Sequence, residues 1–185
     1  ALLCNGTGAG YTVDWGDGTT TNHSFNTIAE KNYVYSSLSA ATDFRGYRQS
    51  LVKVTPQTGA VINNFNIGQK HSSYNYAYTS GWLDLSVNFA SLSFRGIAYL
   101  DPIPRLLERA FFKAITSGNL SYFFNDCISL EEIEIKNMTV LDWNAALGNC
   151  TSLKKVIVPT LQMNLITSCS YAFSGCFELD LSMYS

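Results

Sequence analysis

Residues that commonly bind metal ions or perform catalysis are scarce in this sequence. It has only two histidines, His23 and His71, and its five cysteines form no C-x-x-C pair. A tetrahedral zinc site is therefore disfavoured. No nucleophile elbow, phosphate-binding glycine loop or metal-binding histidine pair is present. We accordingly expect no catalytic residues, no metal site and no cofactor.

Charge and long apolar runs are also scarce. Twelve Lys and Arg stand against 14 Asp and Glu, a formal net charge of −2, and no basic cluster could neutralise a run of phosphates. No apolar run reaches the roughly 18 residues that a membrane-spanning helix needs, and no signal peptide is recognisable. Nucleic acid and membrane insertion are thus not expected.

The sequence does contain enough material for a folded core. Its 185 residues are 46% hydrophobic, which disfavours disorder. Five cysteines are an odd number, so they cannot all pair within one chain. The chain begins without Met and stops within a repeat, where a solenoid would finish with a polar cap, and we expect it to be part of a longer protein.

Three related segments recur in the C-terminal half. Each has Phe or Leu, two residues, Cys, two residues and Leu. The copies are YFFNDCISL (122–130), WNAALGNCTSL (143–153) and YAFSGCFEL (171–179). Their cysteines, Cys127, Cys150 and Cys176, are 23 and 26 residues apart. A period in the twenties is typical of a solenoid, in which each unit buries its apolar face against the next.

A short alternating segment follows each copy: EEIEI, KKVIV and LDL. Two-residue alternation predicts a strand, so each repeat reads as a compact turn or short helix followed by a strand. The shared position of the three cysteines predicts small, buried, unpaired side chains inside the solenoid.

This pattern resembles leucine-rich repeats of the BspA type, over about residues 106–185. The second copy departs from it by having Leu147 in place of Phe. The resemblance implies a short α/β solenoid. Residues 71–105 would then be a connecting segment or an atypical capping repeat.

Residues 102–118 also have apolar residues at helical spacing. They include Leu106, Leu107, Ala110 and Phe111, with charged residues opposite. This pattern predicts an amphipathic helix from near Pro102 to Gly118, packed on the first repeat.

The N-terminal half contains GYTVDWGDGTT (10–20). Tyr11, Val13 and Trp15 alternate with polar residues, as in a strand with one buried face, and Gly16-Asp17-Gly18 predicts a tight turn. Turn chemistry accounts for Asp17 and solvent exposure accounts for Asp14, so a calcium site or a catalytic carboxylate pair is disfavoured.

This turn resembles the WGDG signature of PKD-type domains, which are immunoglobulin-like β-sandwiches found on extracellular and surface proteins. The resemblance covers about residues 1–70 and implies a mainly β protein: a sandwich followed by the repeats. We expect Trp15 in the sandwich core, near Val52 and Val54.

Two candidate recognition surfaces stand out. Tyr74, Tyr76 and Tyr78 alternate, and Trp82 follows them. Aromatic rows can stack on sugars or anchor a protein interface, although covering the junction between the two modules is the simpler interpretation. The second candidate consists of polar repeat positions, namely Glu132, Glu134, Lys154 and Lys155.

The order of VDWGDGT before RGYRQSLVKVTPQTG resembles structural proteins of marine and cyanobacterial tailed phages. This implies a non-enzymatic fibre, decoration or tail component at the virion surface, mediating contact with other virion proteins or a host-surface protein or glycan, and a homo-oligomer stays open. The alternative is a bacterial cell-surface adhesin with the same modules, an extracellular protein. A carbohydrate-active enzyme would need paired acids near an aromatic cleft, whereas Glu131, Glu132 and Glu134 fit a solvated strand face.

Overall fold

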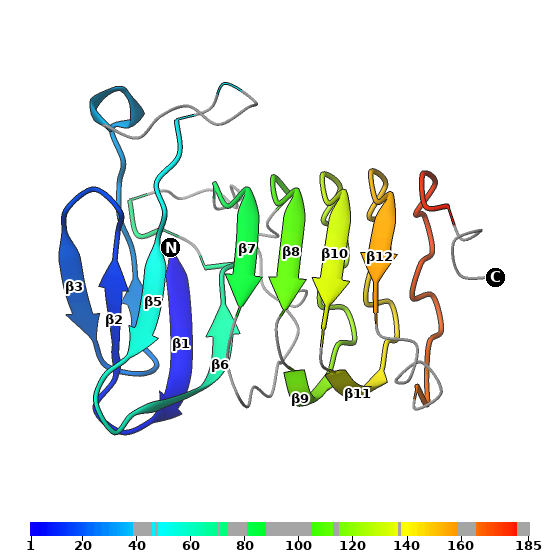
Figure 1. Ribbon diagram of the computed structural model, residues 1–185, viewed down its shortest axis with the longest axis horizontal. Helices are drawn as coiled ribbons and strands as arrows, with labels where there is room; N and C mark the ends of the chain where they lie inside the picture. Colours follow the sequence, from blue (N-terminus) through cyan, green and yellow to red (C-terminus); the bar gives the residue numbers. More distant parts are fainter. Residues whose placement is uncertain are drawn as a thin grey trace.

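The computed structural model describes residues 1–38, 46, 48–69, 71–73, 81–87, 105–112, 115–136, 138–158 and 166–180. The predicted mainly β fold is confirmed (Figure 1). The strands are β1 (Leu2–Thr7), β2 (Tyr11–Asp14), β3 (Thr20–His23), β4 (Ile28–Ala29), β5 (Lys53–Pro56), β6 (Val61–Asn66), β7 (Asp84–Val87), β8 (Arg109–Phe112), β9 (Ile115–Asn119), β10 (Glu132–Ile135), β11 (Met138–Asp142) and β12 (Lys155–Ile157). In these ranges the only helix is the short 3₁₀ helix η1 (Tyr35–Ser37).

The first six strands form two antiparallel sheets, with strand orders β4-β1-β6 and β3-β2-β5. Alternate residues of β1 and β2 are buried, as the two-residue period of a strand predicts. Their inward side chains belong to one core: Leu2, Cys4, Tyr11 and Val13. We call these six strands the N-terminal sheets.

Trp15, directly after β2, lies in this core with 3% of its surface exposed. Its indole Nε1 donates to Thr21 Oγ1 at 2.8 Å. Strand β2 pairs with β5 so that Val13 lies opposite Val54, and Val52 and Val54 pack against the same core. The predicted burial of Trp15 is confirmed.

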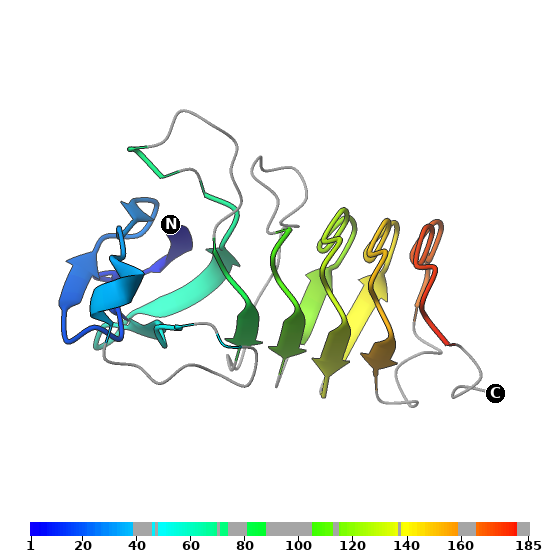
Figure 2. The same cartoon turned by 90° about the horizontal axis from the view of Figure 1, so that it is seen from above.

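A four-stranded parallel sheet follows, with strand order β12-β10-β8-β7, and we call it the long sheet. Strands β8, β10 and β12 each begin one coil of the chain, and these coils stack side by side (Figures 1 and 2). A second, two-stranded parallel sheet pairs β9 with β11. We name each coil after its strand in the long sheet.

One face of the long sheet is buried. In β8 and β10 every second residue is buried, and the inward positions of neighbouring strands are in register. Two rows result: Leu85, Ala110, Ile133 and Val156, followed by Val87, Phe112 and Ile135. Their apolar contact supplies the burial that no single coil could achieve alone.

Turns at 121–126, 144–149 and 170–175 close the coils and stack in a row away from the long sheet (Figure 2). The equivalent residues Asp126, Asn149 and Gly175 have φ values of 63°, 58° and 77°. This left-handed region favours Gly and, among other residues, Asn and Asp. The residue types at this position therefore follow from the backbone that the turn requires.

The repeated cysteines lie at one position of successive coils. Cys150 Sγ donates to the backbone carbonyl of Phe124 at 3.1 Å, and Cys176 Sγ donates to that of Leu147 at 3.1 Å. Cys127 and Cys150 are buried and Cys176 is half-buried, and all three are free thiols. The predicted shared, unpaired position is confirmed, and full burial is confirmed for the first two.

The predicted helix at 102–118 is wrong. Arg109–Phe112 is strand β8, and Ile115–Asn119 is strand β9. Within 109–112 the burial alternates with period two, and β8 is hydrogen-bonded to β7 on one side and β10 on the other. Pairing with two strands and burial of Ala110 and Phe112 outweigh a helical spacing of apolar residues, because propensity is a weak local preference.

The boundaries predicted at residues 70 and 105 stay predictions. Strand β7 lies inside the segment 71–105 and belongs to the parallel sheet. The described part of this segment therefore contributes one strand to the coils.

Replacing Trp15 tests the core of the N-terminal sheets. Because its ring is buried, we expect Trp15→Ala to lower the free energy of unfolding by about 3–5 kcal/mol, measured by chemical denaturation. The matched control is Leu51→Ala, at a residue with 70% of its surface exposed, which should change the value by less than about 0.5 kcal/mol. Equal effects of the two substitutions would contradict the assignment.

Thiol reactivity tests the cysteine positions. Burial raises the pKa of Cys4 to about 12 and also raises the pKa of Cys127 and Cys150, so these thiols lack reactive thiolate. With a chromogenic disulfide reagent at pH 8, exposed Cys169 should react first and half-buried Cys176 more slowly. The three buried thiols should react only in denaturant. Rapid reaction of more than one thiol in a Cys169→Ser variant would refute this order.

Candidate recognition surface

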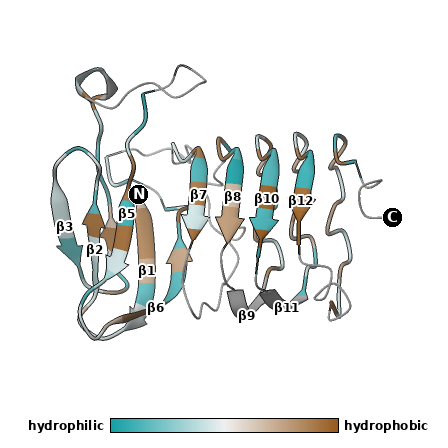
Figure 3. Ribbon diagram, viewed as in Figure 1, coloured by the Kyte–Doolittle hydropathy of each residue, from teal (hydrophilic) through white to brown (hydrophobic). Residues whose placement is uncertain are grey.

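The outward face of the parallel sheet carries a row of alternating charge. The first outward residue of each strand lies in register with the next across all four strands. This row consists of Asp84, Arg109, Glu132 and Lys155. Figure 3 shows hydrophilic residues at the start of β8, β10 and β12. We call this row the charged row.

Neighbouring members of the charged row form ion pairs. Arg109 contacts Asp84 through two hydrogen bonds, Nε to Oδ1 at 2.7 Å and the guanidinium NH2 to Oδ2 at 3.0 Å. These bonds raise the pKa of Arg109 above its usual value. Lys155 Nζ lies 2.8 Å from Glu132 Oε1. Cross-strand pairs of this kind contribute roughly 0.2–1 kcal/mol each, so they order the surface more than they stabilise the fold.

A second set of ion pairs lies just before the strands. Lys154 Nζ is 3.1 Å from Glu131 Oε1 and 3.9 Å from Glu178 Oε2. About half of each of these side chains is exposed to solvent, so the pairs contribute little to stability.

The next outward position gives a different row. Ser86, Phe111, Glu134 and Ile157 lie in register there, and we call them the mixed row. A hollow of about 270 Å³ lies on it, lined by Ser86, Phe111, Phe112, Glu134 and Lys136.

A larger groove of about 1440 Å³ lies between the N-terminal sheets and the outward face of β7 and β8. Its lining includes Tyr33, Val52, Trp82, Asp84 and Phe111. The indole Nε1 of half-buried Trp82 is buried without a hydrogen-bond partner among the described residues. The groove thus extends from the outward face of the parallel sheet to the N-terminal sheets.

The structure places the predicted surface residues as follows. Glu132, Glu134 and Lys155 point outward from β10 and β12, and Lys154 precedes β12. Trp82 lines the groove and precedes β7 by two residues. Residues 74–80, with the three predicted tyrosines Tyr74, Tyr76 and Tyr78, lie outside the described residues. The recognition role of all these residues stays a prediction.

Sequence reasoning missed Asp84, Arg109 and Phe111. A signal was present, because Leu107 lies two residues before β8, as Leu130 lies before β10 and Leu153 before β12. All three leucines are fully buried. Extending the 23-residue period back by one coil would have identified β8.

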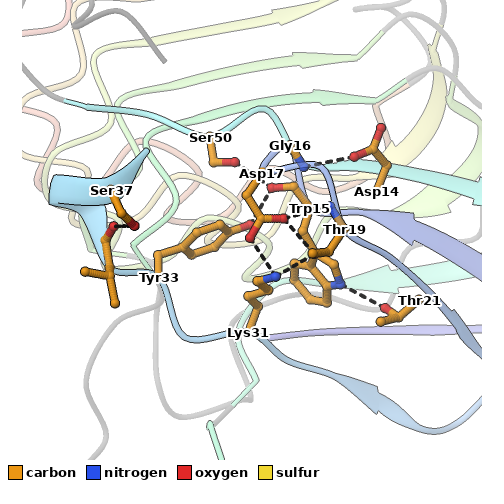
Figure 4. A network of polar contacts seen from close by, with 11 residues as sticks. Asp14, Trp15, Gly16, Asp17, Thr19, Thr21, Lys31, Tyr33, Ser37 and Ser50 are labelled. Atoms are coloured by element: carbon orange, nitrogen blue, oxygen red, sulfur yellow. Dashed lines mark hydrogen bonds and ion pairs between the residues drawn. The ribbon is translucent and has the colours of Figure 1, made fainter. Parts of the chain in front are cut away.

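The Gly-Asp-Gly turn has a structural explanation (Figure 4). Asp14 Oδ1 accepts a hydrogen bond from the Gly16 amide at 2.9 Å, and Asp17 Oδ1 accepts one from the Thr19 amide at 3.1 Å. Lys31 Nζ lies 2.6 Å from Asp17 Oδ2. Both carboxylates are therefore used by the turn.

Among the described residues no group of three or more His, Cys, Asp or Glu side chains is placed to hold a metal ion. Nor do these residues include a helix with the length and apolar character needed to cross a bilayer.

Comparison with protein-family models found no match for this chain, and comparisons with curated proteins and with solved structures found none either.

The Asp17–Lys31 pair predicts a pH effect. Hydrogen bonds from Lys31 and Thr19 lower the pKa of Asp17 to about 2, below the usual value of about 3.9. A lowered pKa stabilises the fold above the unfolded-state value, and the contribution is lost as the pH falls from about 4 to about 2. We expect Asp17→Asn to lower the melting temperature at pH 6, with the difference vanishing near pH 2. In Lys31→Gln the pKa of Asp17 should lie closer to its unfolded-state value, so the loss should be smaller and should be complete at a higher pH. A difference that is equal at both pH values would exclude this linkage.

Proposed function

We propose that this chain is a non-enzymatic structural and recognition protein of a virion, such as a fibre, decoration or tail component. In this proposal the outward face of the parallel sheet contacts another virion protein or a host-surface protein or glycan. The observation that carries the proposal is the charged row, in which side chains from four strands project in register on one face.

The finer fold assignment belongs to the same proposal. The N-terminal sheets would be a PKD-type, immunoglobulin-like sandwich, supported by the hydrogen-bonded Gly-Asp-Gly turn directly after β2. The coils would be BspA-like leucine-rich repeats, supported by the recurring cysteine position and by the parallel sheet with one strand from each coil.

The coil arrangement suits recognition for a physical reason. Equivalent positions of successive coils form a continuous surface, so each outward side chain adds to one extended contact area. In the charged row, opposite charges alternate and are held by cross-strand ion pairs. Such a pattern discriminates between partners by complementarity, because a partner with the wrong register places like charges together.

The acidic residues of this face favour pairing over catalysis. A glycosidase needs two carboxyl groups on opposite sides of a bound sugar, one of them kept protonated. Here Glu131 and Glu132 lie within 3.1 Å of Lys154 and 2.8 Å of Lys155 respectively. Both carboxylates are therefore engaged in ion pairs with lysines, which suits an ordered binding surface better than acid catalysis.

The second candidate is a bacterial surface adhesin built from the same modules. The coil surface would serve it equally well, since function depends on the site and not on the fold. Capsid and tail genes beside the coding sequence would favour the virion, whereas a sorting signal would favour the adhesin.

Two measurements test the proposed function. An antibody raised against the purified chain, used in immunogold electron microscopy on material that carries the gene, should label virus particles, and label confined to cell walls would favour the adhesin. Purified protein incubated with polysaccharides, esters and peptides should release no product. Turnover that a single carboxylate substitution abolishes would overturn the non-enzymatic assignment.

A further inference from the structure

Glu134 differs from the other outward acidic residues of the parallel sheet. Asp84 and Glu132 each have a cation at the adjacent in-register position. The in-register neighbours of Glu134 are Phe111 on one side and Ile157 on the other. Its carboxylate is thus a single negative charge set between an aromatic and an aliphatic side chain.

The cation that Glu134 does contact is loosely held. Lys136 Nζ lies 3.4 Å from Glu134 Oε1, and 64% of the Lys136 side chain is exposed. Lys136 directly follows β10, two residues after Glu134, so this contact joins near neighbours in the sequence. Exposed pairs of this kind contribute little, and a better-placed cation can displace the lysine.

The hollow beside Glu134 has a lining that suits such a cation. Its volume is about 270 Å³, and its lining residues are Ser86, half-buried Phe111, Phe112, Glu134 and Lys136. Arg and Lys side chains carry a charged head on an apolar stem, and the stem packs on apolar surface while the head stays solvated. An aromatic face attracts such a head, and a carboxylate accepts strong, charge-assisted hydrogen bonds from it.

We propose that this hollow binds one basic side chain, arginine or lysine, of a protein partner. The head would contact Glu134 in place of Lys136, and the stem would lie against Phe111. The inference deepens the proposed recognition function and rests on it, since it names the chemistry that the outward face selects.

Other ligands fit the hollow less well. An anion would meet the charge of Glu134 directly. A sugar ring would find an aromatic side chain, but only Ser86 and Glu134 supply outward polar groups beside it within the mixed row. Charge complementarity therefore selects a basic side chain.

A titration of the full chain with short peptides tests the site. The probes are acetyl-Gly-Arg-Gly-amide and its Lys analogue, with acetyl-Gly-Glu-Gly-amide and a neutral trisaccharide as comparisons. Binding is followed by NMR shifts of the Phe111 ring and the Glu134 amide. We expect saturable millimolar binding of the basic probes alone.

Matched variants locate the contact. Glu134→Gln should weaken binding of the basic probes at least fivefold, and Phe111→Leu about threefold. Lys136→Ala should strengthen it about twofold, because it removes the competing cation. Lys154→Ala, which changes a cation away from the hollow, should leave it unchanged. Thermal unfolding of each variant verifies that it is folded. Lys136→Ala is the most specific variant, because it should strengthen binding and leaves Glu134 in place, whereas a loss of folding could only weaken binding.

Three results would overturn the proposal: absence of saturable shifts with the basic probes, unchanged affinity in Glu134→Gln, or equal binding of the acidic or sugar probe. Immunogold labelling and the hydrolysis assays do not depend on this hollow. If the basic peptides do not bind, the proposed virion function is therefore unaffected. If the label lies on cell walls, the virion assignment is wrong, and the titration still decides whether the hollow binds a basic side chain.

Discussion

Backbone hydrogen bonding between successive coils is the constraint on which the rest of the C-terminal structure depends. Alternate amides of the β8 coil turn donate to carbonyls of the β10 coil: Tyr122 to Asn144, Phe124 to Ala146 and Asp126 to Gly148. The next pair of coils repeats this pattern, for example from Leu147 to Ala172. Intervening amides close local turns, as Phe123 does with Leu120. Buried backbone groups must be paired, so each coil has to return to the register that its neighbour offers.

That constraint explains the choice of cysteine inside the stack. The carbonyl of Phe124 accepts two donors, the Cys127 amide and the Cys150 thiol, each at 3.1 Å. The carbonyl of Leu147 likewise accepts hydrogen bonds from the Cys150 amide and the Cys176 thiol. A carbonyl has two lone pairs, and a thiol is small, apolar and a weak donor. Alanine at this position would leave the second lone pair of the neighbouring carbonyl without a hydrogen-bond donor, and a larger residue would push the coils apart.

Much of this architecture could be predicted where one signal dominated. The recurrence of three cysteine-containing segments predicted the stacked coils. The alternation of apolar and polar residues before Trp15 predicted a strand with one buried face. The segment 102–118 failed because Leu107, Ala110 and Phe111 fit a helical period, whereas in strand β8 Ala110 faces inward and Phe111 outward. No local feature showed that β7 and β10 would pair with Arg109–Phe112. Glu132 and Lys155 were predicted as surface residues, but the complete charged row was not, because it depends on the pairing of strands. Asp84 and Arg109 become neighbours only through the register of strands that sequence reasoning had not placed.

Length variation between coils shows which parts the register constrains. Strands β8, β10 and β12 start 23 residues apart, and the turn bonds join residues 22 apart across the first interface but 25 apart across the second, as in Trp143 to Ser168. The difference of three residues therefore arises between the end of β12 and Ser168. Insertions are tolerated where no backbone partner is lost. Strands and turns keep their backbone partners across this difference in length. Changes in the charged and mixed rows can therefore alter the surface without altering the backbone hydrogen bonds of the stack.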